Sequence, residues 1–237
     1  MKKSPNEFSF IEHLDDLRGR LIKIILAMII ASCLVYGVID YILAFLIQPV
    51  GQLVFTSPAD AFLARITLAL FVGFFLSFPV ILYQIWSFVS EGLRPEEKKF
   101  VYFFAPCSFF LFLLGVGFAY FVTIPIAIRF LLSFSTDAII PMITIRNYIS
   151  FLGTMLLAFG VVFELPLVLL FLTKIGVATP AFFSEKRRYA IVCILIVSAV
   201  ITPPDIITQL IMAGPLIILY EIGIIVSKMT YKGKRDE

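Results

Sequence analysis

The sequence predicts an all-α integral membrane protein whose six transmembrane helices form a cupped bundle with short fifth and sixth helices. Three observations favour this fold class. Of the 237 residues, 61% are hydrophobic and only 15% are charged, whereas a typical soluble domain has about 45 to 50% and about 25%. The hydrophobic residues form six long blocks without a charged residue, which is typical of membrane-spanning helices. Proline and glycine interrupt several blocks, and such interruptions bend helices.

The six blocks set the helix boundaries in chain order. A spanning helix needs roughly 20 residues, so the first, fourth and sixth helices reach this length only by including Asp40, Glu164 and Glu221, respectively. No polar linker separates the blocks, and we therefore expect residues 1–237 to form a single domain. The expected helices cover residues 21–47, 64–91, 99–122, 147–174, 188–201 and 206–227.

The fifth helix should be too short to cross a membrane at full thickness. The segment Thr202-Pro203-Pro204 has to end it, because proline disrupts a helix and disfavours helical geometry in the residue before it. The residues from Tyr189 to Ile201 then span about 20 Å at 1.5 Å per residue. A hydrocarbon core is about 30 Å thick, so helices five and six should form a thin flank.

Two further prolines should curve the wall of the bundle. Pro79 lies inside the expected second helix and Pro166 inside the fourth. Each removes one backbone hydrogen bond and bends the helix axis. Bent helices beside a short hairpin predict a cup instead of a cylinder.

The distribution of basic residues predicts the orientation in the membrane. All but three of the 19 lysines and arginines lie before helix one, between helices two and three or four and five, or after helix six. Only Arg65, Arg129 and Arg146 fall on the other side, so the positive-inside rule places both termini in the cytoplasm. We expect no cleavable signal peptide, because the leader before Leu21 contains four acidic residues and the following hydrophobic run is too long.

Catalytic, metal and nucleic-acid chemistry find no support in the sequence. The chain has no GxSxG, HExxH or phosphate-binding glycine loop, and its one histidine, His13, cannot supply a ligand pair or a triad. Cys33, Cys107 and Cys193 stand singly in hydrophobic blocks, which predicts buried thiols and no metal site. The net charge of +3 follows the membrane topology, not a nucleic-acid partner. We expect neither an enzyme nor a cofactor.

Glu164 lies near the middle of the fourth helix, where an ionised side chain costs about 2.5 to 3.5 kcal/mol on insertion scales. One interpretation is that it faces a cavity or a partner and is protonated or hydrogen-bonded. The alternative is that it bonds to the backbone freed by Pro166 or to a neighbouring helix. We favour the functional interpretation, because glutamine would serve the structural role.

Acidic residues gather on the side that is otherwise positively charged, before helix one and between helices two and three. Carboxylates bind guanidinium groups in a bidentate way, so the two segments, if they meet, form a receptor for a basic peptide. The alternative is local pairing along a helix, such as Glu96 with Lys99. Spacing alone leaves both open. The acids are Glu12, Asp15 and Asp16 in the leader and Glu91, Glu96 and Glu97 in the loop.

Several stretches resemble the TatC family, whose members are the multi-span core subunit of the twin-arginine protein translocase. Their order and spacing agree with the family from about Phe10 to Ser227. The stretches are residues 13–21, 57–62, 79–88, 118–121, 159–166 and 202–205, with Gln209 and the pair Tyr220-Glu221.

The resemblance implies a receptor for folded precursor proteins that carry a twin-arginine signal peptide and are exported at the expense of the proton motive force. In family terms the paired arginines are bound by Asp16 in the leader and Glu97 in the loop, with Glu96 as an added neighbour. Many relatives have glutamate in place of Asp16, whose side chain is one methylene shorter. The implied location is a bacterial or archaeal-type inner (plasma) membrane, in a multimeric complex.

The resemblance also implies partners inside the membrane. Glu164 matches the family's intramembrane acid, and Thr202 and Gln209 match a polar patch where the single-span subunits TatA and TatB dock. The segment Pro203-Pro204-Asp205 shapes the turn of the last hairpin, while Pro79 and Pro166 are structural.

Two other function classes fit part of the sequence. A proton-coupled secondary transporter of a small solute could use Glu164 and the broken helices, but it does not need the acidic clusters outside the membrane. A scaffold that only gathers partner helices would depend on Glu164 and Gln209 and not on Asp16 and Glu97.

Overall fold

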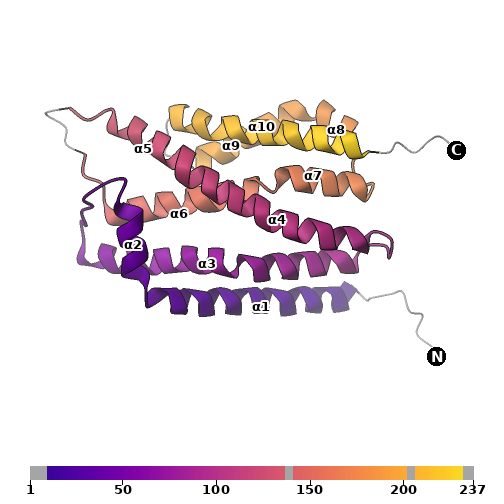
Figure 1. The fold of residues 1–237 in the computed structure, drawn as a ribbon, viewed down its shortest axis with the longest axis horizontal. Coiled ribbons are helices and arrows are strands. Elements are labelled where there is room, and N and C mark those ends of the chain that lie inside the picture. The colour runs from indigo at the N-terminus through magenta and orange to yellow at the C-terminus, as the bar shows by residue number, and fades with distance from the viewer. Residues whose placement is uncertain (1–9, 137–140, 202–205, 232–237) are drawn as a thin grey trace.

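The computed structural model describes residues 10–136, 141–201 and 206–231, with side chains from Leu14 onward. The described elements are helices apart from one isolated β-bridge, which confirms the all-α prediction. In chain order the helices are α1 Phe10–Tyr36, α2 Ile39–Ile47, α3 Pro58–Glu91, α4 Lys98–Phe118, the π-helical turn η1 Ala119–Thr123, α5 Ile124–Leu132, α6 Ile145–Val162, α7 Leu165–Lys174, α8 Pro180–Glu185, α9 Arg187–Ile201 and α10 Ile206–Thr230 (Figure 1).

Within the described residues, five helical stretches are long and hydrophobic enough to cross a membrane. α9 is shorter: its 15 residues span about 22 Å at the usual rise per residue. It ends at Ile201, immediately before the segment Thr202 to Asp205, which lies outside the described residues. The five long stretches are Leu14–Tyr36, Pro58–Glu91, Lys98–Leu132, Ile145–Lys174 and Ile206–Thr230.

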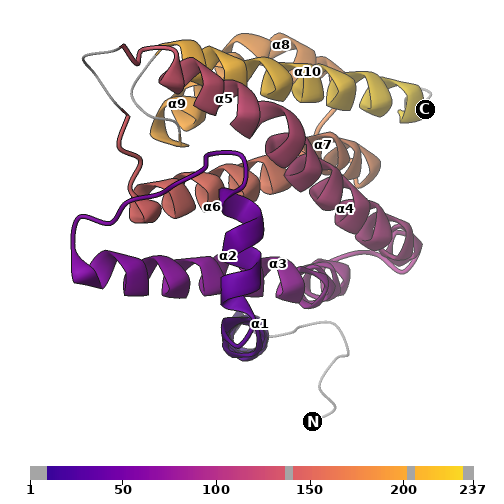
Figure 2. The same ribbon diagram turned by 60° about the vertical axis from the view of Figure 1, so that its left-hand side comes forward.

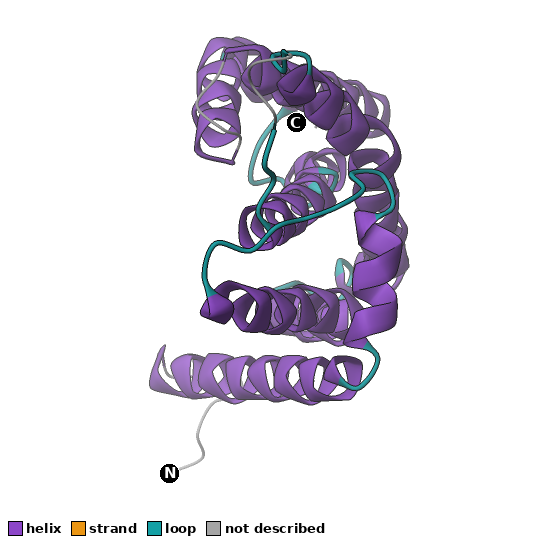
Figure 3. Cartoon of the chain, turned by 90° about the vertical axis from the view of Figure 1, so that its left-hand side faces the viewer, coloured by secondary structure: helices purple, strands orange, loops and turns teal. Residues whose placement is uncertain are grey.

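The helices form an open, curved layer and not a closed ring, as the view in Figure 3 shows. α1 packs against α3, which contacts both α4 and α6, and α4 runs diagonally across the bundle to contact α6 (Figure 1). α10 packs against α7 and α9 on the side away from α1 (Figure 2). This arrangement confirms the predicted cup.

The bundle has two ends of different structure. The terminal face is the end at which α1 begins and α10 ends (Figure 1). The bridge face is the opposite end, where the loop after α2 meets the loop before α6. There Val54 N–H donates to the carbonyl of Ile143 at 3.0 Å, and Ile145 N–H donates to the carbonyl of Val54 at 2.9 Å. These two backbone bonds tie loops that are far apart in the sequence.

The first expected helix, 21–47, is wrong as a single element. α1 begins at Phe10 and ends at Tyr36, and α2 turns steeply away from it (Figure 1). The chain breaks at Gly37 and Val38, where Val38 has a non-helical ψ of 12°. Tertiary packing explains the break, because α2 buries Ile39, Leu43 and Leu46 by crossing the bundle.

The second and third helices are longer than expected. α3 begins at Pro58 and not at residue 64, because Ser57 and Asp60 form a capping box. The Ser57 side chain accepts the backbone N–H of Asp60, and the Asp60 side chain accepts the backbone N–H of Ser57. The third helical path continues past residue 122 through η1 and α5 to Leu132. Pro125 stands in the first turn of α5, where its missing N–H is tolerated, and the π-helical turn precedes it.

Much hydrophobic surface faces outward, as a lipid-facing bundle requires. Only 11% of the most hydrophobic window of α1 is buried inside the protein. The expectation of buried thiols is wrong for Cys33 and Cys193, which are exposed, while Cys107 is partly buried. Their hydrophobic sequence surroundings reflect contact with the membrane and not with a protein core.

Glycine permits a close approach of α4 and α6. A Cβ atom on Gly115 would lie 2.5 Å from the carbonyl oxygen of Phe159 and 2.8 Å from the side chain of Phe163. Phe159 is fully buried. Small residues at such contacts let membrane helices pack backbone to backbone, and this contact holds the middle of the cup together.

The hydroxyl of Tyr148 in α6 donates to the carbonyl of Leu46 at the end of α2, at 2.6 Å. Tyr148 is only 4% exposed. We expect Tyr148→Phe to lower the free energy of unfolding by about 1 to 3 kcal/mol, because a buried carbonyl loses its partner. Thermal unfolding in detergent measures the change. Tyr41→Phe is the control, since Tyr41 is 81% exposed, and equal stability of the two variants would contradict the prediction.

Candidate functional site

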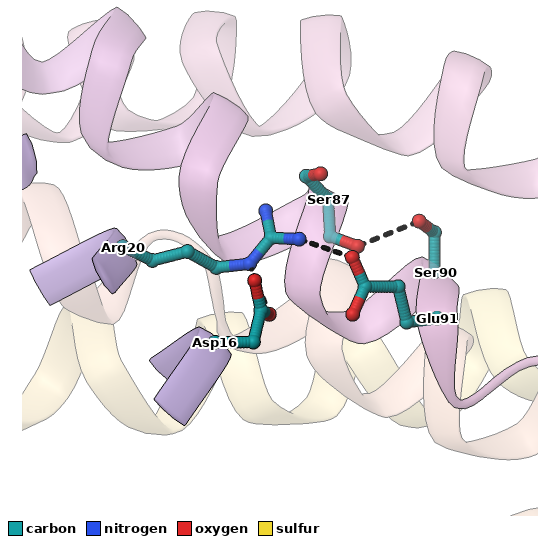
Figure 4. Close-up of polar contacts among 5 residues, drawn as sticks. All are labelled: Asp16, Arg20, Ser87, Ser90 and Glu91. Atoms are coloured by element: carbon teal, nitrogen blue, oxygen red, sulfur yellow. Dashed lines mark hydrogen bonds and ion pairs between the residues drawn. The ribbon is translucent and has the colours of Figure 1, made fainter. Parts of the chain in front are cut away.

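An ion cluster joins α1 to α3 at the terminal face. Arg20 Nε donates to Asp16 Oδ2 at 2.6 Å, and Arg20 Nη2 donates to Glu91 Oε1 (Figure 4). The Arg20 side chain is 12% exposed, whereas Asp16 and Glu91 are 36% and 43% exposed. The acids therefore remain open to water while the guanidinium between them is covered.

Local structure explains how these three residues meet. Asp16 and Arg20 are four residues apart on α1, which places them on one helix face. Glu91 is the last residue of α3, the helix against which α1 packs. The acidic leader and the end of α3 thus come together through Arg20 and Glu91. The sequence named Glu91 among the loop acids, but it did not single out Arg20 for the site. The spacing of Asp16 and Arg20 was the available signal.

The other two predicted acids lie in the loop that leads into α4. Glu97 precedes α4, and its Oε2 accepts the backbone N–H of Arg94 at 3.1 Å. Glu96 is exposed. Lys99, which the sequence offered as a local ion-pair partner of Glu96, lies instead over the ring of Phe100, with Nζ 5.6 Å from the ring centre. The carboxylate of Glu97 therefore orders its own loop. The contact that joins α1 to α3 is that of Arg20 with Glu91, while Asp16 pairs with Arg20 within α1.

A groove of about 410 Å³ opens between α3 and α4 beside this cluster. Ser87 and Ser90 form part of its wall, and the close-up in Figure 4 shows both serines next to Glu91. The groove combines aromatic rings, hydroxyl groups and one ammonium group. Its lining residues are Tyr83, Trp86, Ser87, Ser90, Lys98, Val101, Tyr102, Ala105 and Pro106.

Glu164 stands at a break in the fourth expected helix, so the single helix 147–174 is wrong. α6 ends at Val162 and α7 begins at Leu165. The cause is Pro166 in the first turn of α7, which cannot donate a backbone hydrogen bond to α6. Glu164 occupies the cap position of α7, but its side chain makes no cap hydrogen bond. The first part of the structural alternative, a bond to the freed backbone, is therefore not seen. The second part, a bond to a neighbouring helix, fits the nearby Ser108 of α4.

The carboxyl group of Glu164 turns toward α4 instead. It lies near Ser108, whose Oγ accepts Trp86 Nε1 at 3.1 Å. The Oε1 atom of Glu164 is buried and has no hydrogen-bond partner among the described residues. A buried carboxyl oxygen without a partner is costly, so this atom is suited to a donor from another molecule or to a proton.

The last hairpin is held by two polar contacts. Gln209 Nε2 donates to the carbonyl of Leu195 at 3.0 Å, which ties α10 to α9. Arg187 binds Glu221 through two bonds of 2.5 and 2.9 Å near the terminal face. Of the other predicted residues, Pro79 lies inside α3, while Thr202, Pro203, Pro204 and Asp205 lie outside the described residues.

Comparisons with known proteins agree along the chain. The family model described as Sec-independent protein translocase protein (TatC) matches residues 12–215. The Sec-independent protein translocase protein TatC of Carboxydothermus hydrogenoformans is 44% identical over 93% of each chain. The TatC of Aquifex aeolicus is 38% identical over 95% of this chain and 97% of that protein.

A solved structure gives the same result for the fold. The crystal structure of a twin arginine translocase receptor, TatC, superposes with a TM-score of 0.85. It is 39% identical to this chain and covers 92% of this chain and 99% of its own. This match confirms the all-α, six-helix membrane fold that the sequence predicts. The expectation of a short sixth helix is wrong, because α10 has 25 residues and is long enough to cross a membrane.

Proposed function

Because the chain belongs to the TatC family and is a subunit of the twin-arginine protein translocase, we propose that its terminal face binds the twin-arginine signal peptides of folded precursor proteins. The same relatives give no support to the small-solute transporter. The chain is a multi-pass protein of the bacterial inner membrane. We place both termini in the cytoplasm, since the basic residues gather on the terminal face.

The observation that carries the proposal is the set of water-accessible carboxylates on the terminal face, contributed by α1, the end of α3 and the following loop. Asp16 is partly exposed, Glu96 is exposed, and Glu97 is partly exposed. Carboxylates discriminate arginine from lysine because the planar guanidinium matches them in bidentate geometry. In this proposal Asp16 and Glu97 bind the paired arginines, and Glu96 adds negative charge beside them.

The membrane interior serves a different step. We assign Glu164, with its unpartnered buried oxygen, to contact with TatA- or TatB-type single-span subunits, together with Thr202 and Gln209 on the short last hairpin. The chain itself acts as a receptor and assembly platform and not as an enzyme. The transport it mediates draws on the proton motive force through the assembled, multimeric complex.

Peptide binding in lipid nanodiscs tests the receptor function. The protein should bind a twin-arginine signal peptide and should bind the same peptide with two lysines more weakly. We expect Glu97→Ala to weaken binding of the arginine form by about tenfold or more, the value of a hydrogen bond to a charged group.

Glu185→Ala is the matched control, because Glu185 is an exposed acid at the end of α8 and should leave binding unchanged. Equal binding of the arginine and lysine peptides by the unmodified protein would overturn the receptor function. Unchanged binding by Glu97→Ala alone would remove Glu97 from the site.

A further inference from the structure

Arg20 is itself a guanidinium, and it lies among the carboxylates that the proposed function assigns to the signal peptide. Its Nε donates to Asp16 and its Nη2 to Glu91, acids that come from two different helices (Figure 4). A guanidinium presents its N–H donors in a planar fork, and two of them are used here. The chain thus already holds, at this position, the chemical group that a twin-arginine peptide would bring.

The burial of the three side chains allows an exchange. Arg20 is 12% exposed, whereas Asp16 and Glu91 are 36% and 43% exposed. A carboxylate accepts more than one hydrogen bond, so an incoming guanidinium can reach both acids from the water side before Arg20 leaves. The long aliphatic stem of Arg20 would then let its charged end move to water or to lipid head groups.

The charges of the cluster favour such an exchange. Among these three side chains, Asp16 and Glu91 supply two negative charges and Arg20 one positive charge, so the three together carry one negative charge in excess. A peptide with two adjacent arginines brings two positive charges. Only the first is balanced while Arg20 stays, and both are balanced once Arg20 has moved away.

We propose that Arg20 is a resident occupant of the receptor site that a peptide guanidinium displaces, and that Glu91 is a further peptide-binding residue beside Asp16. The proposal rests on the proposed function and adds Glu91 to the acids Asp16, Glu96 and Glu97 that the proposed function assigns to the same site. The groove of about 410 Å³ that Ser87 and Ser90 line opens next to Glu91, so chain flanking the arginines has a surface to occupy.

The test is the affinity of the twin-arginine peptide for the full-length protein in nanodiscs. Arg20→Gln removes the competitor and keeps a polar side chain, so we expect the dissociation constant to fall about threefold to fivefold, the scale of a partly exposed ion pair. Glu91→Gln should raise it by a similar factor. Arg18→Gln is the matched control, because Arg18 is an exposed arginine on the same helix, and its removal should weaken binding or leave it unchanged.

Methylguanidinium gives a second measurement. At millimolar concentration it should refill the place vacated in Arg20→Gln and weaken peptide binding to that variant more than binding to the unmodified protein. If Arg20→Gln does not yield monodisperse protein, peptide binding by Arg20→Lys is the test in its place. Lysine keeps the positive charge, but its ammonium lacks the planar geometry with which a guanidinium binds two carboxylates. Arg20→Lys should then bind the peptide more tightly than the unmodified protein.

The outcomes separate this proposal from the proposed function. If the unmodified protein does not prefer arginine over lysine peptides, the receptor function itself fails. If that preference is present but Arg20→Gln binds more weakly or equally, Arg20 is only a clasp between α1 and α3, and the exchange is overturned. Tighter binding by Arg18→Gln as well would show a general charge effect and would equally overturn it.

Discussion

A Glu164→Gln variant is expected to bind the twin-arginine peptide as the unmodified protein does and yet to lose at least about nine-tenths of precursor export. The carboxyl group lies at the break between α6 and α7, near Ser108 and away from the terminal face. Glutamine keeps the size of the side chain and one acceptor oxygen but removes the possible charge. Loss of one hydrogen bond to a charged group corresponds to about tenfold or more.

Export of a twin-arginine reporter protein in cells that lack their own TatC measures the effect, and co-purification of the single-span subunits locates it. Glu185→Gln, a change of the same kind at an exposed position, should export normally. Normal export together with normal co-purification in Glu164→Gln would show that the acid has no partner role. Weakened peptide binding in that variant would instead place Glu164 in the receptor step.

Gly115→Leu is expected to prevent assembly of the bundle. A Cβ atom at this position would meet the backbone oxygen of Phe159 at 2.5 Å, and backbone in a packed helix cannot move aside as a flexible side chain can. Overpacking of this kind costs about 1 to 3 kcal/mol or more. The yield of monodisperse protein and its unfolding temperature in detergent measure the effect.

Gly117→Leu is the control for Gly115→Leu. Gly117 lies two residues further along α4, and a Cβ atom there would have no neighbour within 4 Å. The two variants add the same hydrophobic volume to the same helix. Similar behaviour of both would mean that the contact between α4 and α6 tolerates a larger separation than the structure shows.

The sequence was sufficient for the class of fold, because charge and hydrophobicity alone determine which segments can enter a membrane. The uncharged blocks predict the five long helical stretches, and the Thr202-Pro203-Pro204 segment predicts the end of the short α9. It was insufficient for α2, since the break at Gly37 depends on burial of Leu43 and Leu46 against distant helices. A hydrophobic run looks the same in one helix or in two.

The candidate site was predictable in part for a similar reason. A carboxylate in a hydrophobic block, such as Glu164, is conspicuous in the sequence because an ionised side chain inside a membrane is costly in free energy. Glu91 was named among the loop acids, but its pairing with Arg20 was not predictable, because the two residues are 71 positions apart and no spacing rule links them. Glu97 was chosen through the family resemblance, while the structure shows that its carboxylate bonds within its own loop. Whether it also binds peptide arginines stays a prediction.

The two faces of the bundle should respond differently to dissolved salt. Both carry ion pairs, since Arg65 with Asp40 and Arg146 with Asp60 lie toward the bridge face, but the bridge face is also tied by backbone bonds. Backbone hydrogen bonds between Val54 and the segment before α6 close the bridge face. At the terminal face, Arg20 with Glu91 and Arg187 with Glu221 are partly exposed ion pairs, which dissolved salt screens. High ionic strength or a charged peptide should therefore loosen the helix ends of the terminal face more readily than the loops of the bridge face, whose backbone hydrogen bonds salt does not screen.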